Sequence, residues 1–237
     1  MRIRITLLLF QLIAVKIFSQ EQLFSIALTA KLQSVSMSAG KESHFGELYL
    51  QTTIAGDVYI QSLPANGQQL MKRMEQNFAG YFFRAIEARY NETMIPAEWQ
   101  NYFNGKELTA LQLKLMGGNA HINGDIWQAM RSSFSLAELK EIKPFYKNYN
   151  DPVTKVFDNL FENGIESDKR LRNLHLITFG FDKVCGRMML HKWRNRQWKL
   201  AILSFENPGR FKRLKKRIDK KRNKIDQLII NRLRTAE

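Results

Sequence analysis

The 237-residue sequence contains one cysteine and four histidines, which restricts the chemistry open to it. A single thiol cannot form a disulfide within the chain, and we expect Cys185 to pack as a small apolar side chain. A zinc centre needs three or four protein ligands, and the histidines stand at no recognised ligand spacing. The sequence also has no P-loop, dinucleotide-binding fingerprint, nucleophile elbow or H-E-x-x-H motif. These absences leave no enzyme class that a short motif would identify.

Long apolar runs are also scarce, and the one at the start of the chain has the layout of a secretory signal peptide. Arg2 and Arg4 precede an apolar run over residues 5–17, which Lys16 interrupts near its end, and Glu21 follows a polar boundary. The run is too short for a comfortable membrane span. We therefore expect residues 1–20 to be a signal peptide and the protein to be exported, to a periplasm or out of the cell. The alternative is that this run forms a buried first helix.

Apolar residues recur mainly at helical spacing, without a convincing series of alternating strands. Proline and glycine clusters divide this pattern into segments. The sequence therefore predicts one all-α domain over residues 21–206, a bundle of about six to seven helices with short connections. The expected helices span residues 21–37, 44–61, 68–90, 107–131, 136–163 and 168–205.

The formal net charge of +15 is concentrated at the C-terminal end of the chain. From residue 207 to residue 237, twelve lysines and arginines stand against three acidic residues. Apolar residues in this tail follow a three-four spacing, which predicts a basic amphipathic helix over residues 207–237. The helix would either dock on the bundle or bind an anionic membrane surface. Nucleic acid is not expected as a partner of an exported protein.

The most unusual segment is "MGGNAHINGDIWQAM", residues 116–130, because it places glycines and polar residues inside a predicted helix. At 100° per residue, His121 and Asp125 share one face with three of the glycines, and apolar residues occupy the other face. Asn119 and Asn123 lie at the edge between the two faces. Both faces are thus specialised, which predicts a central helix. His121 and Asp125 could share a proton, a water or a metal ion; the alternative is a structural pair at a close helix crossing.

This segment resembles the signature G-x-N-A-H-I-N-x-D of an uncharacterised bacterial family of helical proteins, a domain of unknown function. Weaker similarities follow in order along residues 43–204. They include "HFGELYLQTTIAGDV", "RMEQNFAGYFFRAI", "WQNYF" and "RNRQWKLA". The chain departs from the family pattern at Leu113, where many members have histidine, and at Ile126, where leucine is usual. The resemblance implies a helical fold with a shared polar centre, and it implies no reaction.

The polar residues in these segments define a candidate site. We expect His121, Asp125 and Arg194 to meet in a buried catalytic site. The expected ligand-binding residues are Tyr49, Thr52, Arg73, Asn119 and Asn123. With two guanidinium groups, such a site could bind a carboxylate or a phosphate. A divalent metal cofactor, if there is one, would be held by His121 and Asp125.

Three functions fit these predictions. The first is a hydrolase acting on a phosphate or lipid ester, with His121 as general base or metal ligand and Asp125 orienting it. The second is a noncatalytic envelope protein in which the same residues hold a small molecule or lipid, or form a rigid polar core. The third is a membrane-surface protein that acts through its basic tail.

Overall fold

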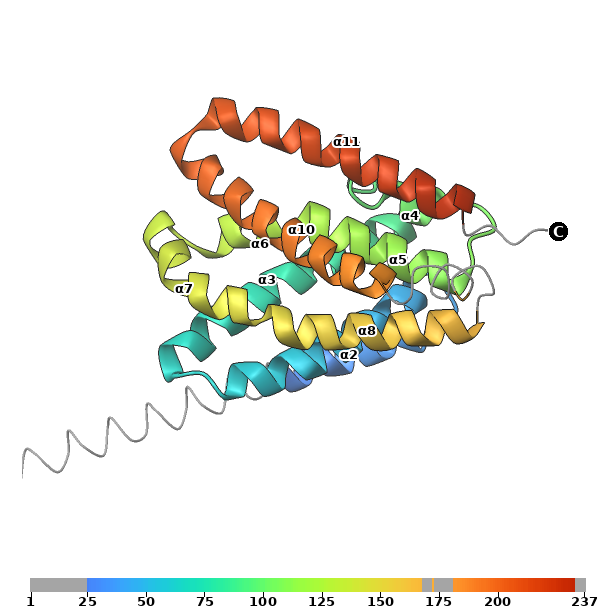
Figure 1. Ribbon diagram of the computed structural model, residues 1–237, viewed down its shortest axis with the longest axis horizontal. Helices are drawn as coiled ribbons and strands as arrows, with labels where there is room; N and C mark the ends of the chain where they lie inside the picture. Colours follow the sequence, from blue (N-terminus) through green and yellow to red (C-terminus); the bar gives the residue numbers. More distant parts are fainter. Residues whose placement is uncertain (1–24, 168–171, 173–180, 233–237) are drawn as a thin grey trace, which may run out of the picture.

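The structure, a computed structural model, describes residues 25–167, 172 and 181–232 (Figure 1). The described residues form helices and contain no strand, which confirms the predicted all-α fold. The predicted signal peptide, residues 1–20, lies outside them. A helix over residues 25–36 comes first. It is followed by α2 (Glu42–Gln61), α3 (Ala65–Tyr90), α4 (Gln100–Asn104), α5 (Ala110–Ala120), the π-helical turn η1 (His121–Asp125), α6 (Ile126–Ser133), α7 (Leu136–Asn148), α8 (Asn150–Ser167), α10 (Phe181–Glu206) and α11 (Pro208–Arg232).

Two antiparallel helix pairs enclose the motif segment in Figure 1. Residues 62–64 join α2 to α3, and Asn207 joins α10 to α11. Between the pairs run α5, η1 and α6, which contact α2 and α3 on one side and α10 and α11 on the other. The prediction that the motif helix is central is therefore confirmed.

The motif segment is not the single regular helix that was predicted over residues 107–131. It begins at Ala110, where a capping box pairs the Thr109 side chain with the Gln112 backbone and the Gln112 side chain with the Thr109 backbone. It then widens into η1 and continues as α6 to Ser133. A π turn takes up more residues than an α turn, so the 100° spacing does not hold through His121–Asp125.

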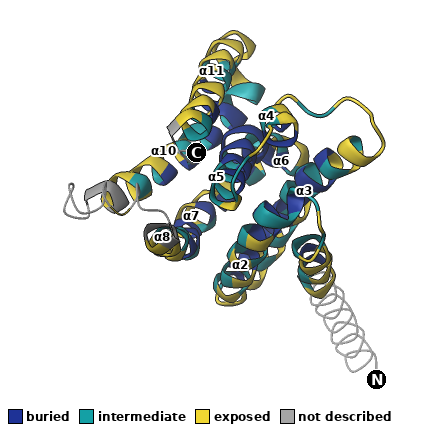
Figure 2. Ribbon diagram, turned by 90° about the vertical axis from the view of Figure 1, so that its right-hand side faces the viewer, coloured by how far each residue is buried: buried dark blue, intermediate teal, exposed yellow. Residues whose placement is uncertain are grey.

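Two apolar clusters form the core, and the motif segment contributes to both. One cluster surrounds Phe45, Phe82 and Trp99, and it includes Met116 of α5. The other extends from α3 to α7 and includes Ile126 of α6. Figure 2 shows buried residues along α5 and α6 at the centre and exposed residues on the outer side of α11. The helix that carries the polar motif therefore connects the two halves of the core.

Helix α11 docks on the bundle, which was one of the two alternatives predicted for the basic tail. It packs against α5 and α10, and Ile218, Arg222 and Asp226 are buried. The Gln112 side chain donates hydrogen bonds to the carbonyls of Ile229 and Ile230, 3.1 and 3.2 Å away. Among the residues that the structure describes, no helix combines the length and apolarity needed to cross a membrane.

We predict that substitution of the neighbouring glycines of α5 has opposite effects. A Cβ atom on Gly117 would overlap the ring of Phe45, which is buried and cannot move away easily, whereas a Cβ atom on Gly118 meets nothing within 4 Å. Gly117→Ala should lower the free energy of unfolding by about 1–3 kcal/mol through overpacking. Gly118→Ala should raise it by up to about 1 kcal/mol because alanine favours the helix.

Urea denaturation of the two variants measures the difference. Equal effects of the two substitutions would contradict the close packing of α5 against α2.

Candidate functional site

His121 and Asp125 form a buried pair within η1. The imidazole Nδ1 lies 2.8 Å from Asp125 Oδ2, and the residues are 2% and 1% exposed. The indole nitrogen of Trp99, just before α4, donates a second hydrogen bond to the same oxygen over 3.0 Å. The predicted contact between His121 and Asp125 is thus present, with Trp99 as an additional partner that the sequence analysis did not include.

Aromatic rings surround the imidazole. Phe78 of α3 stacks on it with a centroid distance of 3.5 Å and an interplanar angle of 11°. Phe45 and Tyr49 of α2 contact it edgewise, with centroids 5.5 and 4.6 Å away. Nε2 of His121 is buried and has no hydrogen-bond partner. The ring is therefore held by one hydrogen bond, at Nδ1, and by the aromatic rings around it.

Burial shifts both members of the pair toward their uncharged forms. It lowers the pKa of His121 well below its usual value. It raises the pKa of Asp125 well above its usual value, against the opposing effects of the Trp99 hydrogen bond and the positive charges of Arg222 and Arg84. An uncharged carboxyl and an uncharged imidazole can share a hydrogen bond without burying net charge.

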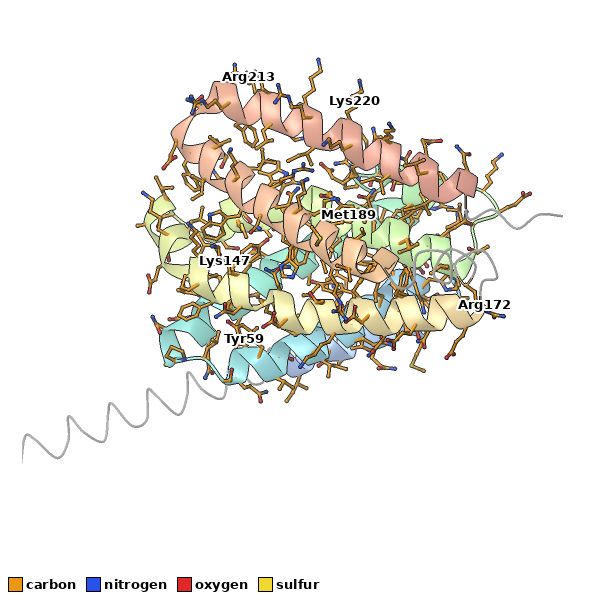
Figure 3. All side chains as sticks on the ribbon, in the orientation of Figure 1. Tyr59, Lys147, Arg172, Met189, Arg213 and Lys220 are labelled. Atoms are coloured by element: carbon orange, nitrogen blue, oxygen red, sulfur yellow. The ribbon has the colours of Figure 1, made fainter. Side chains whose placement is uncertain are left out.

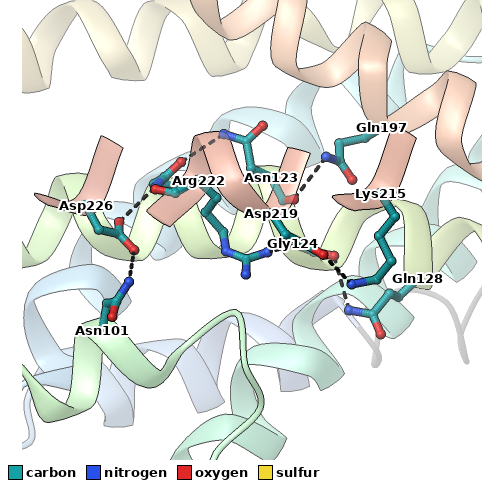
Figure 4. A network of polar contacts seen from close by, with 10 residues as sticks. Asn101, Asn123, Gly124, Gln128, Gln197, Lys215, Asp219, Arg222 and Asp226 are labelled. Carbon is teal, nitrogen blue, oxygen red and sulfur yellow. Dashed lines mark hydrogen bonds and ion pairs between the residues drawn. The ribbon is translucent and has the colours of Figure 1, made fainter. Parts of the chain in front are cut away.

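The two asparagines of the motif link it to α11 and α10. Asn119 donates to the Arg222 carbonyl over 2.9 Å and to Asp226 Oδ1 over 2.8 Å, and Asn123 donates to Asn119 Oδ1 over 2.9 Å. Figure 4 shows the surrounding network, in which Gln197 of α10 donates to the Asn123 carbonyl over 3.0 Å. These hydrogen bonds hold α10 and α11 against η1.

A cavity of about 460 Å³ lies beside the motif, between α2, α3, α5, α8, α10 and α11. Most of its lining is apolar, and Leu115 and Ile122 contribute from the motif segment itself. Cys185 and Met189 of α10 line it and are exposed, so this end of the cavity lies at the protein surface. The expectation that Cys185 packs as a buried apolar side chain is therefore wrong. The polar residues in the lining include Tyr49, Thr52, Glu75, Asn119, His121, Tyr149 and Arg194.

The structure separates the two arginines of the predicted site. Arg194 lines the cavity together with His121, but its hydrogen bonds go to Asn150 Oδ1 and, over 3.4 Å, to the Tyr146 carbonyl. Arg73 lies outside the cavity with 40% of its side chain exposed, and it pairs with Glu138 at 2.5 Å. Arg194 is therefore buried at the same cavity as His121 but forms no hydrogen bond with the His121–Asp125 pair, and its catalytic role stays a prediction. The expected convergence of Arg73 on this pair is wrong.

The other predicted ligand-binding residues divide between the cavity and the scaffold. Tyr49 and Thr52, one turn apart on α2, line the cavity, and the Thr52 hydroxyl donates to the Leu48 carbonyl over 2.9 Å. Asn119 lines the cavity and also binds α11, whereas Asn123 is not part of the lining. Binding of a ligand by these side chains stays a prediction.

Glu75 and Tyr149 form a second buried pair that the sequence analysis missed. The Tyr149 hydroxyl donates to Glu75 Oε1 over 2.5 Å, and both residues line the cavity. Burial raises the pKa of Glu75 to about 8, against the lowering effect of the Tyr149 hydrogen bond; Asp57 adds to the increase and Lys72 opposes it. Glu75 interrupts the apolar stripe of α3 next to Met74, and this interruption was the available signal.

The described residues contain no group of three or more histidine, cysteine, aspartate or glutamate side chains that could hold a metal ion. His121 and Asp125 bond to each other, and no third candidate ligand joins them there.

We predict that Glu75 makes the protein less stable as the pH rises from about 4.5 to about 8. Its pKa is higher in the folded protein, about 8, than its ordinary value of 4.5. Between these values the unfolded chain loses the Glu75 proton while the folded protein retains it. The stabilisation that the protonated Glu75 contributes is therefore fully present below pH 4.5 and is lost as the pH rises to about 8. Over this range the free energy of unfolding should fall by a few kcal/mol.

Glu75→Gln should remove this dependence and be more stable than the wild type at pH 8. Carbon NMR of the Glu75 carboxyl gives its titration midpoint directly. Tyr149→Phe should raise this midpoint, because it removes the hydroxyl that donates a hydrogen bond to Glu75. A Glu75 midpoint near 4.5 would refute the assignment.

Comparison with known proteins supports the family but not an activity. No curated protein and no solved structure matches the chain. Residues 26–232 match the model of a family described as "Family of unknown function (DUF5995)". This match confirms the expected membership of a domain family of unknown function, while the specific signature and a bacterial origin stay predictions. The match extends from the helix that precedes α2 to the last described residue of α11, and the chain belongs to the DUF5995 family.

Proposed function

We propose that the protein binds a small, mainly apolar molecule in the cavity beside the motif helix. The observation that carries this proposal is the cavity itself, about 460 Å³ of space lined by six helices of the bundle. Binding sites for small molecules are typically about 300–1,000 Å³ and mostly apolar, with a few polar groups that orient the ligand. The size and lining of this cavity agree with that description.

An empty space of this size opposes folding. Apolar lining that stays in contact with water costs free energy, which a bound apolar molecule would recover by displacing that water. The apolar lining offers few partners to water, and the cavity reaches the surface beside Cys185. Retention of the space is therefore better explained by an exchangeable ligand than by loose packing.

Hydrolysis of a lipid ester is the second candidate, favoured by the presence of the His121–Asp125 pair at the cavity wall. A hydrolase of the serine or cysteine type needs a nucleophile within hydrogen-bond reach of its base. Nε2 of His121 has no hydrogen-bond partner, so no such nucleophile is in place among the described residues. Ligand binding without catalysis therefore accounts for the cavity and the His121–Asp125 pair without requiring a nucleophile.

The ligand proposal predicts that filling the cavity from Gly118 abolishes binding. Gly118 lines the cavity, and a Cβ atom there meets nothing within 4 Å. Gly118→Leu should keep the fold and weaken binding of the uncharged fluorophore N-phenyl-1-naphthylamine by at least about tenfold, or 1.4 kcal/mol. Gly118→Ala is the matched control and should bind the fluorophore nearly as the wild type does. Fluorescence titration measures all three proteins, and equal binding by the leucine variant would place the ligand elsewhere.

We further propose that α11 brings the protein to an anionic membrane surface. The exposed residues of α11 include eight lysines and arginines and no acid; Asp219 forms ion pairs with Lys215 and Arg222, and Asp226 is buried. Figure 3 shows Arg213 and Lys220 pointing away from the bundle. Each cation near an anionic leaflet contributes about 1 kcal/mol of attraction. A membrane would also be a source of apolar ligands for the cavity.

Charge reversal on α11 tests this surface. The triple variant Lys216→Glu, Lys220→Glu and Lys224→Glu should weaken binding to vesicles containing phosphatidylserine by on the order of a hundredfold. Reversal of three exposed lysines on α7 (Lys140, Lys143 and Lys147) is the control and should weaken binding much less.

Vesicle flotation at low salt gives the measurement, and higher salt should reduce binding as screening increases. Binding to DNA without binding to vesicles would contradict the membrane proposal.

A further inference from the structure

Arg194 is a buried cation without an acidic partner among the described residues. It is 3% exposed, and the two groups that accept its hydrogen bonds, the Asn150 side chain and the Tyr146 carbonyl, carry no charge. Arg222 is equally buried but forms an ion pair with Asp219 over 2.9 Å. Buried charges in proteins are normally paired, because an unpaired charge loses its hydration without compensation. The missing negative charge at Arg194 therefore needs an explanation.

The surroundings of Arg194 hold its guanidinium at the cavity wall. The guanidinium carbon lies 4.4 Å from the ring centroid of Tyr146 and 5.4 Å from that of Tyr149. Its Nε donates to Asn150, and its Nη2 donates weakly to Tyr146. The hydrogen bonds of the guanidinium to the described residues use Nε and Nη2, and Arg194 lines the cavity. Two aromatic rings and two hydrogen bonds thus hold the group, and Nη1 is left as a donor for a further partner.

The nearby acids do not supply the missing charge. Glu75 lines the same cavity, but its carboxyl accepts the Tyr149 hydroxyl, and its pKa of about 8 keeps it mostly protonated at neutral pH. Asp125 is occupied by His121 and Trp99. Both acids form hydrogen bonds that do not include Arg194.

We propose that the cavity binds an aliphatic monocarboxylate, with the carboxylate on Arg194 and the hydrocarbon chain along the apolar lining. This inference rests on the proposed ligand-binding function and specifies the head group. One uncompensated cation is balanced by one monoanion. A phosphate group would bring more charge and more acceptor atoms than this guanidinium can satisfy, since two of its nitrogens are already engaged. A neutral head group would leave the cation unbalanced.

The wild-type protein gives the first test, with dodecanoate and 1-dodecanol as probes of equal chain length. Calorimetric titration should show that the carboxylate binds at least about tenfold more tightly, because a hydrogen bond between two charged groups is stronger than one between the guanidinium and a neutral hydroxyl. Equal affinity would overturn the carboxylate inference and leave the ligand-binding proposal intact. Failure of both probes and of the neutral fluorophore to bind would refute the ligand-binding proposal and the inference with it.

Variants of α10 identify the residue responsible. Arg194→Met removes the guanidinium and keeps an unbranched apolar side chain that reaches about as far as Nε, so the ratio of the two affinities should fall to near one. Arg187→Met is the matched control, because Arg187 lies on the same helix outside the cavity lining and pairs with Asp158 at 2.5 Å. The ratio of dodecanoate affinity to 1-dodecanol affinity in Arg187→Met should equal that of the wild type. A carboxylate preference that persists in Arg194→Met would overturn the role of Arg194.

Cys185 provides an independent readout in the wild type should the methionine variant fold poorly. Its thiol is exposed and lines the cavity, so bound dodecanoate should slow its reaction with Ellman's reagent, and equimolar 1-dodecanol should do so less. Equal protection by the two probes would count against the carboxylate assignment.

Discussion

The burial of the Asp125 carboxyl is the constraint on which the centre of the bundle depends. A carboxyl that is 1% exposed must be hydrogen-bonded or neutralised. Asp125 receives a hydrogen bond from Trp99, shares one with His121, and lies in the positive field of Arg222 and Arg84. These partners come from the segment before α4, from η1, from α11 and from α3. The hydrogen bonds and charges that stabilise the buried Asp125 carboxyl therefore fix the positions of several elements. The stacking of Phe78 on His121 adds a contact between α3 and η1.

The two sides of the motif segment differ in how their polar groups are satisfied. Toward α11, Asn119, Asn123 and Asp226 have hydrogen-bond partners within the protein, whereas Arg222 Nε and Gln197 Oε1 have none. Toward the cavity, Arg194 has no counter-charge among the described residues and His121 Nε2 has no partner. A sequence shaped only by stability would pair or replace such groups, since each unpaired buried polar atom costs about 1–3 kcal/mol. The two sides differ in charge pairing, because the buried Arg222 has Asp219 as a partner and the buried Arg194 has only uncharged partners among the described residues, and this difference favours the cavity side as the candidate ligand site.

Periodicity was enough to predict much of the fold, because burial in a helical bundle follows from local spacing. The helix predicted over residues 68–90 from apolar spacing is present as α3, with Met71, Met74 and Phe82 buried, and the two specialised faces of the motif correctly indicated a central helix. The π turn was beyond this reasoning, because a regular helical wheel assumes the geometry that η1 departs from. The two arginines show a larger limit of prediction from local spacing. Arg73 and Arg194 both lie on helices beside aromatic residues, yet only the packing of distant helices decides that one is exposed and the other buried. Glu75 was missed for the same reason, since its partner Tyr149 lies 74 residues away.

Helix α11 shows why the basic tail has to be understood together with the bundle. One face contributes Ile225 and Ile229 to the cavity wall, and Asp226 on the same helix accepts hydrogen bonds from Asn119 and Asn101. The opposite face carries the exposed cations. Because one rigid helix joins these faces, a membrane bound to the cations would lie on the far side of α11 from the cavity. The exposed end of the cavity, beside Cys185, lies on α10 instead. The surface proposed for electrostatic attachment, on α11, and the exposed end of the cavity, on α10, are therefore separate, so a ligand drawn from a membrane in the proposed way would have to pass around the α10–α11 hairpin.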